Sequence, residues 1–149
     1  MSYYAVIDTN VIISALLSKK ADSATVKIIN SIFTGDIIPV LHSEIIDEYK
    51  EVLHRAKFNL EPHTIFKVLS AIQNFGIEVY PIHTDEIFID IDDRIFYEAA
   101  LAINAYLITD NKKHYPASKF ILSPAEMLNI INHDLTLNTS NNGEIQNLL

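Results

Sequence analysis

Short apolar runs alternate with longer stretches of helical periodicity along most of this chain. The apolar runs cover residues 3–7, 37–41, 77–80, 105–109 and 120–122, and the helical stretches cover 10–17, 23–33, 43–56, 62–75 and 92–104. Such runs are typical of strands buried in a parallel sheet, and strands that alternate with helices form βαβ units. We therefore expect an α/β fold in which helices flank a central parallel sheet, as a single domain.

Two glycines and a proline interrupt this pattern. Gly35 and Gly76 each follow a helical stretch, where glycine tolerates the left-handed conformation of a C-terminal cap. Pro39 lies inside the second apolar run and has no N–H to donate to a neighbouring strand. It predicts that this run is an edge strand or contains a bulge.

Two serines predict where helices begin. Ser43 precedes Glu44 and an apolar-periodic stretch, which is typical of an N-cap. Ser123, Pro124 and Glu126 form a capping-box pattern that opens a last helix ending near residue 132. We expect a folded domain over residues 1–132. Residues 133–149 are rich in Asn, Thr and Ser, which predicts a tail that is flexible or docks on a partner.

Composition narrows the class of protein. A chain of 149 residues that is 49% apolar can bury a sizeable core. No run approaches the roughly 20 apolar residues that cross a bilayer, and the first residues lack a signal-peptide pattern, so we expect a cytoplasmic protein that does not enter membranes. The net charge of -8 argues against binding nucleic acid through a basic surface. A nuclease whose carboxylates bind divalent metal is the exception.

Carboxylates directly follow two of the predicted strands. Asp8 follows residues 3–7 and Asp110 follows residues 105–109, so both would lie at the carboxyl ends of strands. Open α/β sheets bind their ligands in the crevice at this edge. The two acids would lie close together if their strands are neighbours. Either one alone is equally well explained as a cap or a turn residue.

The helical stretch 43–56 supplies a further acid. At about 100° per residue, Glu48 lies at the edge of the apolar stripe, whereas Asp47 points away from it. Glu44 lies one turn earlier and nearly in line, so it competes with Glu48 for a place in the crevice. An ordinary solvated charge is the alternative explanation for each.

Three acids precede the stretch 92–104, namely Asp90, Asp92 and Asp93. Exposed N–H groups and the helix dipole favour acids at a helix N-terminus, so one of the three is expected to be a cap. The spacing does not say which one. Asp93 lies one turn before Phe96, at the edge of the apolar face, which favours it for the crevice.

These acids suit one kind of chemistry. Three or four carboxylates around one crevice, in a chain without cysteine, match a hard cation such as Mg²⁺ or Mn²⁺. Such a cation lowers the pKa of a bound water and stabilises charge on a phosphodiester. The six histidines lack ligand spacing and are not expected to bind metal. Lys112, Lys113 and His114 either contact phosphate or form a solvated loop.

Five segments occur in a specific order and spacing: 8–16 (DTNVIISAL), 43–49 (SEIIDEY) with Val52 and Leu53, 90–93 (DIDD), 106–116 (YLITDNKKHYP) and 123–124 (SP). Together they resemble the PIN domain, and most of all the toxin components of bacterial and archaeal toxin-antitoxin pairs. The resemblance runs from Tyr3 to about Ile131. It implies that Asp8, Glu48 and Asp93 are catalytic acids and metal ligands.

The fourth acidic position of this family falls on a departure from the usual pattern. Asp110 stands where glycine is common, and Asn111 stands where the functional side chain is expected. We take Asp110 as the fourth catalytic and metal-binding residue, with Asn111 as the alternative. The polar residues expected to support the ligands are Asn10, Ser14, Thr109 and Asn111.

The resemblance implies a Mg²⁺- or Mn²⁺-dependent endoribonuclease with an RNA substrate, held inactive by a cognate antitoxin protein. Domains of this family commonly dimerise, and an apolar surplus in the first helices predicts a homodimer or higher oligomer. This surplus comprises Val11, Ile12, Leu16, Ile28, Ile29 and Ile32. Two alternatives stay open: a non-catalytic α/β interaction module that binds no metal, and a phosphoacceptor domain with acids, a Thr and a Lys at its strand ends.

Overall fold

The computed structural model describes residues 1–148, and the side chains of residues 1–138. Within them, five parallel strands form one sheet in the order β3-β2-β1-β4-β5. The strands are β1 (Tyr3–Ile7), β2 (Ile37–Leu41), β3 (Ile77–Glu78), β4 (Tyr106–Ile108) and β5 (Ile121–Leu122). The predicted parallel α/β sheet is confirmed, with β1 at its centre.

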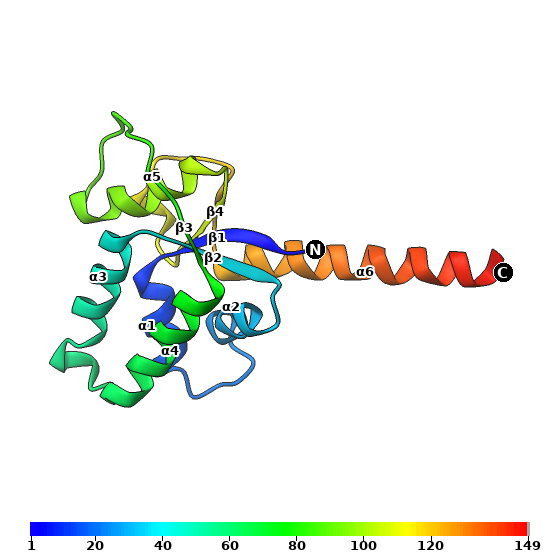
Figure 1. Cartoon of the computed structure of the whole chain (residues 1–149), viewed down its shortest axis with the longest axis horizontal. Helices are drawn as coiled ribbons and strands as arrows, with labels where there is room; N and C mark the ends of the chain where they lie inside the picture. The colour runs from blue at the N-terminus through cyan, green and yellow to red at the C-terminus, as the bar shows by residue number, and fades with distance from the viewer. Residues whose placement is uncertain (149) are drawn as a thin grey trace.

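Helices cover both faces of this sheet (Figure 1). Helix α5 and the connection before it lie on one side, and α1, α2 and α4 lie on the other. The helices are α1 (Thr9–Leu17), α2 (Ala24–Phe33), α3 (Ser43–Leu53), α4 (Pro62–Phe75), α5 (Arg94–Ala102) and α6 (Pro124–Leu148), with 3-10 turns η1 (Ala56–Phe58), η2 (Ile91–Asp93) and η3 (Lys112–His114). The chain leaves β1 toward β2 on one side and later returns to β4 on the other. The carboxyl ends of β1 and β4 therefore form a topological switch point, where sheets of this kind bind ligands.

The apolar residues of the first two helices lie inside this chain's own core. Val11, Ile12, Ile28, Ile29 and Ile32 are all buried, and Leu16 packs against the core. The apolar side chains that predicted self-association are thus buried within the chain itself, because α1 and α2 pack on each other and α2 packs on β2. Association of two copies stays a prediction without that support.

Pro39 does not mark an edge strand, because β2 lies between β1 and β3. The Pro39 carbonyl lies close to Gly76, on the side of the strand that faces β3. Pairing between β2 and β3 starts only at Val40 and Ile77, so the missing N–H of Pro39 removes no hydrogen bond from the sheet. Gly76 is extended and not left-handed. A Cβ there would come within 2.7 Å of the Ile72 carbonyl and 2.9 Å of the Pro39 carbonyl, so close approach of the backbone requires glycine. Gly35 has the predicted positive φ, at +82°.

Helix caps differ in part from the expected ones. The N-cap of α3 is His42, whose ring accepts from the N–H of Glu44, and Ser43 is already helical. The predicted capping box of α6 is confirmed: Ser123 Oγ accepts from the N–H of Glu126 at 3.2 Å, and the Glu126 carboxylate accepts from the N–H of Ser123 at 2.9 Å.

The last helix extends beyond its predicted end. Helix α6 begins against α2 and β5 and continues to Leu148, well past residue 132, projecting away from the sheet (Figure 1). The role predicted for residues 133–149 stays a prediction, because the side chains from 139 onward and the whole of residue 149 lie outside the described residues. No helix in the described part of the chain is long and apolar enough to cross a membrane.

Candidate active site

Asp8 occupies the switch point because of the register between β1 and β4. Ile7 pairs with Ile108, so the next residues, Asp8 and Thr109, lie opposite each other at the carboxyl ends of the two strands. The N–H of Asp8 donates to the Ile108 carbonyl at 2.9 Å. The strands before Asp8 and Asp110 are neighbours, which was the condition under which the two acids were expected to lie close together. The register, however, places Thr109 and not Asp110 directly across from Asp8.

Three side chains donate hydrogen bonds to one oxygen of the Asp8 carboxylate. Oδ2 accepts from the Thr109 hydroxyl at 2.9 Å, from the Tyr115 hydroxyl at 2.9 Å and from the Asn10 amide at 3.4 Å. No described side chain donates to Oδ1. Burial raises the pKa of Asp8, and the hydrogen bonds from Thr109 and Tyr115 oppose that rise. The backbone N–H of Thr9 also lowers the pKa of Asp8. Asp8 is therefore a buried carboxylate whose Oδ2 is held by three side chains.

Asp93 brings a second carboxylate to the same place. It ends η2, immediately before α5, and its Oδ2 is buried without a hydrogen-bond partner among the described residues. The ring of His114 lies nearby, with Nδ1 3.4 Å from that oxygen. Burial and then the negative charges of Asp8 and Asp90 raise the pKa of Asp93 to about 6. A buried carboxylate oxygen without a donor beside a second acid is a position that a cation would satisfy.

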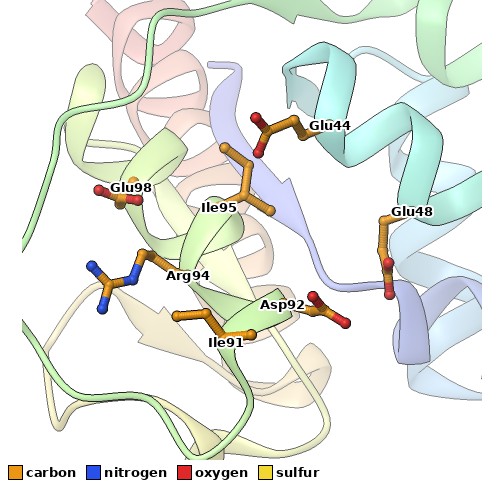
Figure 2. Close-up of a pocket in the computed structure, with 7 residues that line it drawn as sticks. All are labelled: Glu44, Glu48, Ile91, Asp92, Arg94, Ile95 and Glu98. Carbon is orange, nitrogen blue, oxygen red and sulfur yellow. The ribbon is translucent and has the colours of Figure 1, made fainter.

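Glu48 lies in a neighbouring pocket of about 310 Å³ between α3 and α5 (Figure 2). Its carboxylate and that of Asp92 face each other across the pocket, and Glu44 points into it from one turn earlier on α3. Burial, then the charge of Asp92, raises the pKa of Glu48. The structure thus pairs Asp8 with Asp93 and Glu48 with Asp92. Asp90 caps η2 by accepting from the Asp92 N–H at 3.0 Å, so it is the expected cap.

Tyr49 fixes the helix that carries Glu48 to the strand that ends at Asp8. This tyrosine is fully buried, and its hydroxyl donates to the carbonyl of Ile7, the residue before Asp8. Its ring packs against that of Phe96 on α5, with centroids 6.1 Å apart. A buried hydroxyl without a partner would be costly, so this contact sets the position of α3 relative to the switch point.

The remaining predicted residues reach the site in different ways. Asn10 donates to Asp8, and its Oδ1 accepts from the N–H of Asp110 at 3.3 Å. Asp110 itself is exposed, and it contacts the site through its backbone N–H. The N–H of Asn111 donates to the Thr109 hydroxyl at 3.0 Å. Ser14 faces α2, where its hydroxyl lies 3.3 Å from that of Thr25.

Two residues of the site were missed by sequence reasoning. Asp92 was set aside in favour of Asp93, but the short 3-10 turn η2 directs one acid toward Glu48 and the other toward Asp8. Helical periodicity carries no signal for such a turn. Tyr115 belongs to the connection after β4, where no pattern predicts direction. Its closeness in sequence to Thr109, at the end of β4, was the one available hint.

The donor set fits a hard divalent cation at Asp8 and Asp93. Among the described side chains, no three Asp, Glu or His residues gather closely enough to hold a metal by themselves. Mg²⁺ is often bound by only one or two carboxylates, with water and substrate phosphates completing its octahedron. Asp8 Oδ1, without a donor among the described side chains, and Asp93 Oδ2, whose nearest polar neighbour is His114 Nδ1 at 3.4 Å, are two oxygens of that kind.

Comparison with known protein families identifies the family of this chain. The family model of the PIN domain matches residues 4–113, which is about three quarters of the chain and includes every predicted acidic site residue. No curated protein matches the chain. Tyr115 lies just beyond the matched residues. The chain belongs to the PIN domain family, whose members are generally nucleases and typically ribonucleases.

Proposed function

We propose that this protein is an endoribonuclease that hydrolyses RNA phosphodiester bonds with Mg²⁺ or Mn²⁺. The observation that carries the proposal is the meeting of Asp8 and Asp93 at the switch point. No described side chain donates to Asp8 Oδ1, and the buried Oδ2 of Asp93 has only the ring of His114 nearby, at 3.4 Å. Two adjacent carboxylates, one buried and one half-buried, oppose each other's ionisation, and a cation beside them would remove that penalty. Membership of the PIN domain family supports the same conclusion.

Two roles are assigned to the residues of this site, namely holding the cation and orienting the carboxylate of Asp8. Asp8 and Asp93 would hold the cation, and Thr109, Tyr115 and Asn10 orient the carboxylate of Asp8. A divalent cation, when bound, supplies a Lewis acid that activates water and stabilises negative charge on phosphate oxygens. Because the carboxylates serve as ligands, the reaction needs no covalent protein nucleophile.

Glu48 and Asp92 line a pocket beside the Asp8 site and add further negative charge there. Together with Asp110, which contacts Asn10 through its backbone, Glu48 completes the four acids that we assign to catalysis. Neither is bonded to Asp8 in the described structure, so we propose that both act when RNA phosphates and the cation are in place. The expected order of importance is Asp8 and Asp93 first, then Glu48, then Asp110.

Cleavage of single-stranded RNA with increasing Mn²⁺ tests the proposal. The parent chain is expected to cleave only with added metal, and Asp8→Asn is expected to abolish cleavage. Asp47→Asn is the matched control, because it removes the same charge from an exposed position on α3. Equal cleavage in excess EDTA would contradict the proposal. A parent chain that neither binds metal nor cleaves RNA would favour an interaction module. Stable labelling of Asp8 by a phosphate analogue would favour a phosphoacceptor domain.

We further propose that the enzyme is the toxin of a toxin-antitoxin pair and acts in the cytoplasm, where its RNA substrates are. The connection before α5 supports binding of a protein partner. Arg94 donates to the carbonyls of Thr84 and Glu86 at 2.9 and 3.1 Å, which fixes this connection to the helix. Large apolar side chains on it are nevertheless exposed, namely Tyr80, Ile82, Ile87, Ile89 and Ile91. Exposed apolar patches beside a site mark binding surfaces.

Expression in a bacterial host tests the toxin role. The parent chain is expected to arrest growth, Asp8→Asn is expected to permit it, and a co-expressed antitoxin is expected to restore growth to cells that make the parent. Substituting Ile87 and Ile89 with serine is expected to weaken this rescue without reducing cleavage. Growth unaffected by an actively cleaving parent would contradict the toxin role.

We also propose that the protein forms a homodimer. A monomeric mass in light scattering would contradict this proposal.

A further inference from the structure

The Asp8 carboxylate is held asymmetrically, and Tyr115 is one of the two residues that hold it most closely. Thr109 and Tyr115 both donate to Oδ2 at 2.9 Å. Thr109 follows β4 directly, whereas Tyr115 lies beyond η3, so the donors reach one oxygen from different parts of the chain. Two such bonds restrict rotation of the carboxylate about its Cβ–Cγ bond. No described side chain donates to the other oxygen, Oδ1.

We propose that Tyr115 is a positioning residue for the cation: by holding Oδ2 of Asp8, it presents Oδ1 as the ligand oxygen. This inference rests on the proposed metal-dependent function. Residues that hydrogen-bond a ligating carboxylate orient it before the metal arrives, and their loss typically weakens metal binding. Both hydrogen bonds to Oδ2 come from side chains of the fold itself, so the orientation of the carboxylate is set by the chain's own packing.

The environment of Tyr115 keeps its hydroxyl a hydrogen-bond donor. The side chain is buried, and its ring packs edge-on against Phe88, with centroids 6.4 Å apart. Burial and the charges of Asp8 and Asp93 raise the pKa of the phenol well above its usual range, so it stays protonated. Packing alone would be served by phenylalanine. The hydroxyl adds a buried polar group that is tolerated because it bonds to Asp8.

A purely structural tyrosine is the rival explanation, and Tyr97 provides the matched control. Tyr97 is also buried and also packs edge-on against Phe88, with centroids 5.5 Å apart, but it is not among the side chains that donate to Asp8. Tyr115→Phe and Tyr97→Phe therefore each remove one hydroxyl from the same aromatic cluster. The first removes a bond to the proposed ligand, and the second does not.

Calorimetric titration of the full chain with Mn²⁺ distinguishes the two explanations. Tyr115→Phe is expected to bind Mn²⁺ about 10- to 100-fold more weakly than the parent, and Tyr97→Phe is expected to match the parent. Thermal unfolding and near-ultraviolet circular dichroism in EDTA establish that each variant is folded. Unchanged or tighter Mn²⁺ binding by folded Tyr115→Phe would overturn the inference, as would an equal loss in Tyr97→Phe.

A double-mutant comparison isolates the path through Asp8. In an Asp8→Asn background, Tyr115→Phe is expected to cause no further loss of the remaining Mn²⁺ affinity, because the ligand that it positions is gone. An equal loss in both backgrounds would overturn the inference. Failure of the proposed function gives a different result: Mn²⁺ binding that depends on Tyr115, without RNA cleavage by the parent, upholds the positioning role and refutes the nuclease. A parent chain that binds no Mn²⁺ overturns both.

Discussion

The carboxylates of Asp8 and Asp93 meet at the switch point of the sheet although 85 positions separate them in the sequence. Burial of Asp93, reinforced by the charge of Asp8, raises the pKa of Asp93 to about 6. Without a cation the fold therefore holds two acids together at a cost in stability. Sites that carry such strained charge pairs are typically functional, because a bound ligand relieves the repulsion.

Asp8→Asn is expected to raise the stability of the metal-free chain while abolishing RNA cleavage. Asparagine keeps the size of the side chain and an acceptor oxygen for Thr109 and Tyr115, but it removes the buried charge that opposes Asp93. Urea unfolding in EDTA measures the stability, and cleavage with Mn²⁺ measures the activity. A variant less stable than the parent in EDTA would contradict the repulsion on which this prediction rests.

The sequence was sufficient to predict the sheet and the first acids of the site. The order of apolar runs and helical stretches gave the parallel arrangement, since Tyr3–Ile7 and Ile37–Leu41 became β1 and β2 with their predicted bounds. Asp8 followed because a strand end fixes position along the sheet. Asp93 was favoured from the edge of a helical stripe, although the structure places it in the 3-10 turn η2 just before α5. The position of Asp8 depends on regular periodicity, which converts sequence spacing into position along the sheet.

The rest of the site depends on irregular backbone. The 3-10 turn η2 directs Asp92 and Asp93 to different neighbours, and the connection after β4 brings Tyr115 back to Asp8. Pro39 is a second example. A proline is tolerated in this central strand because β3 pairs with β2 only from Val40 onward, and the sequence around Pro39 does not reveal where that pairing starts. Tertiary contacts settle these features, and no local pattern in the sequence reports them.

The pH dependence of stability provides a second prediction about Asp93. Its pKa is raised from 3.8 to about 6 in the folded chain, so the folded state binds the proton more tightly than the unfolded state. Stability is therefore lost as the pH rises from about 4 to about 6, and the loss is complete above that range. The stability difference between Asp93→Asn and the parent, measured in EDTA, is expected to grow in favour of the variant over this window. A difference independent of pH would contradict the raised pKa.

Ser123→Ala tests the capping box that begins α6. Loss of a serine N-cap typically costs about 1 kcal/mol, and this serine also positions the Glu126 N–H. Bonds from the Ser123 backbone and Lys112 lower the pKa of Glu126 to about 2. The contribution of Glu126 is therefore present above its ordinary pKa and is lost as the pH falls toward 2. Urea unfolding at pH 7 measures the cost of Ser123→Ala, and no measurable change would show that α6 starts elsewhere.

Two glycines are expected to respond differently to alanine. Gly76→Ala would place a Cβ within 3 Å of two backbone carbonyls and should cost about 2–3 kcal/mol through overpacking. Gly35→Ala meets open space, so it should cost only the strain of a positive φ, about 1 kcal/mol. Chemical denaturation of both variants checks the order. A larger loss at Gly35 would contradict the close approach of β2 to Gly76.

Anomalous diffraction from crystals grown with Mn²⁺ tests most directly the central claim that Asp8 and Asp93 share a divalent cation. We predict a peak within coordination distance of Asp8 Oδ1 and Asp93 Oδ2, with Tyr115 still donating to Asp8 Oδ2. The peak should disappear in crystals of Asp8→Asn grown in the same way. A peak confined to the pocket of Glu44, Glu48 and Asp92, or no peak at Asp8 and Asp93 in the parent, would contradict the account.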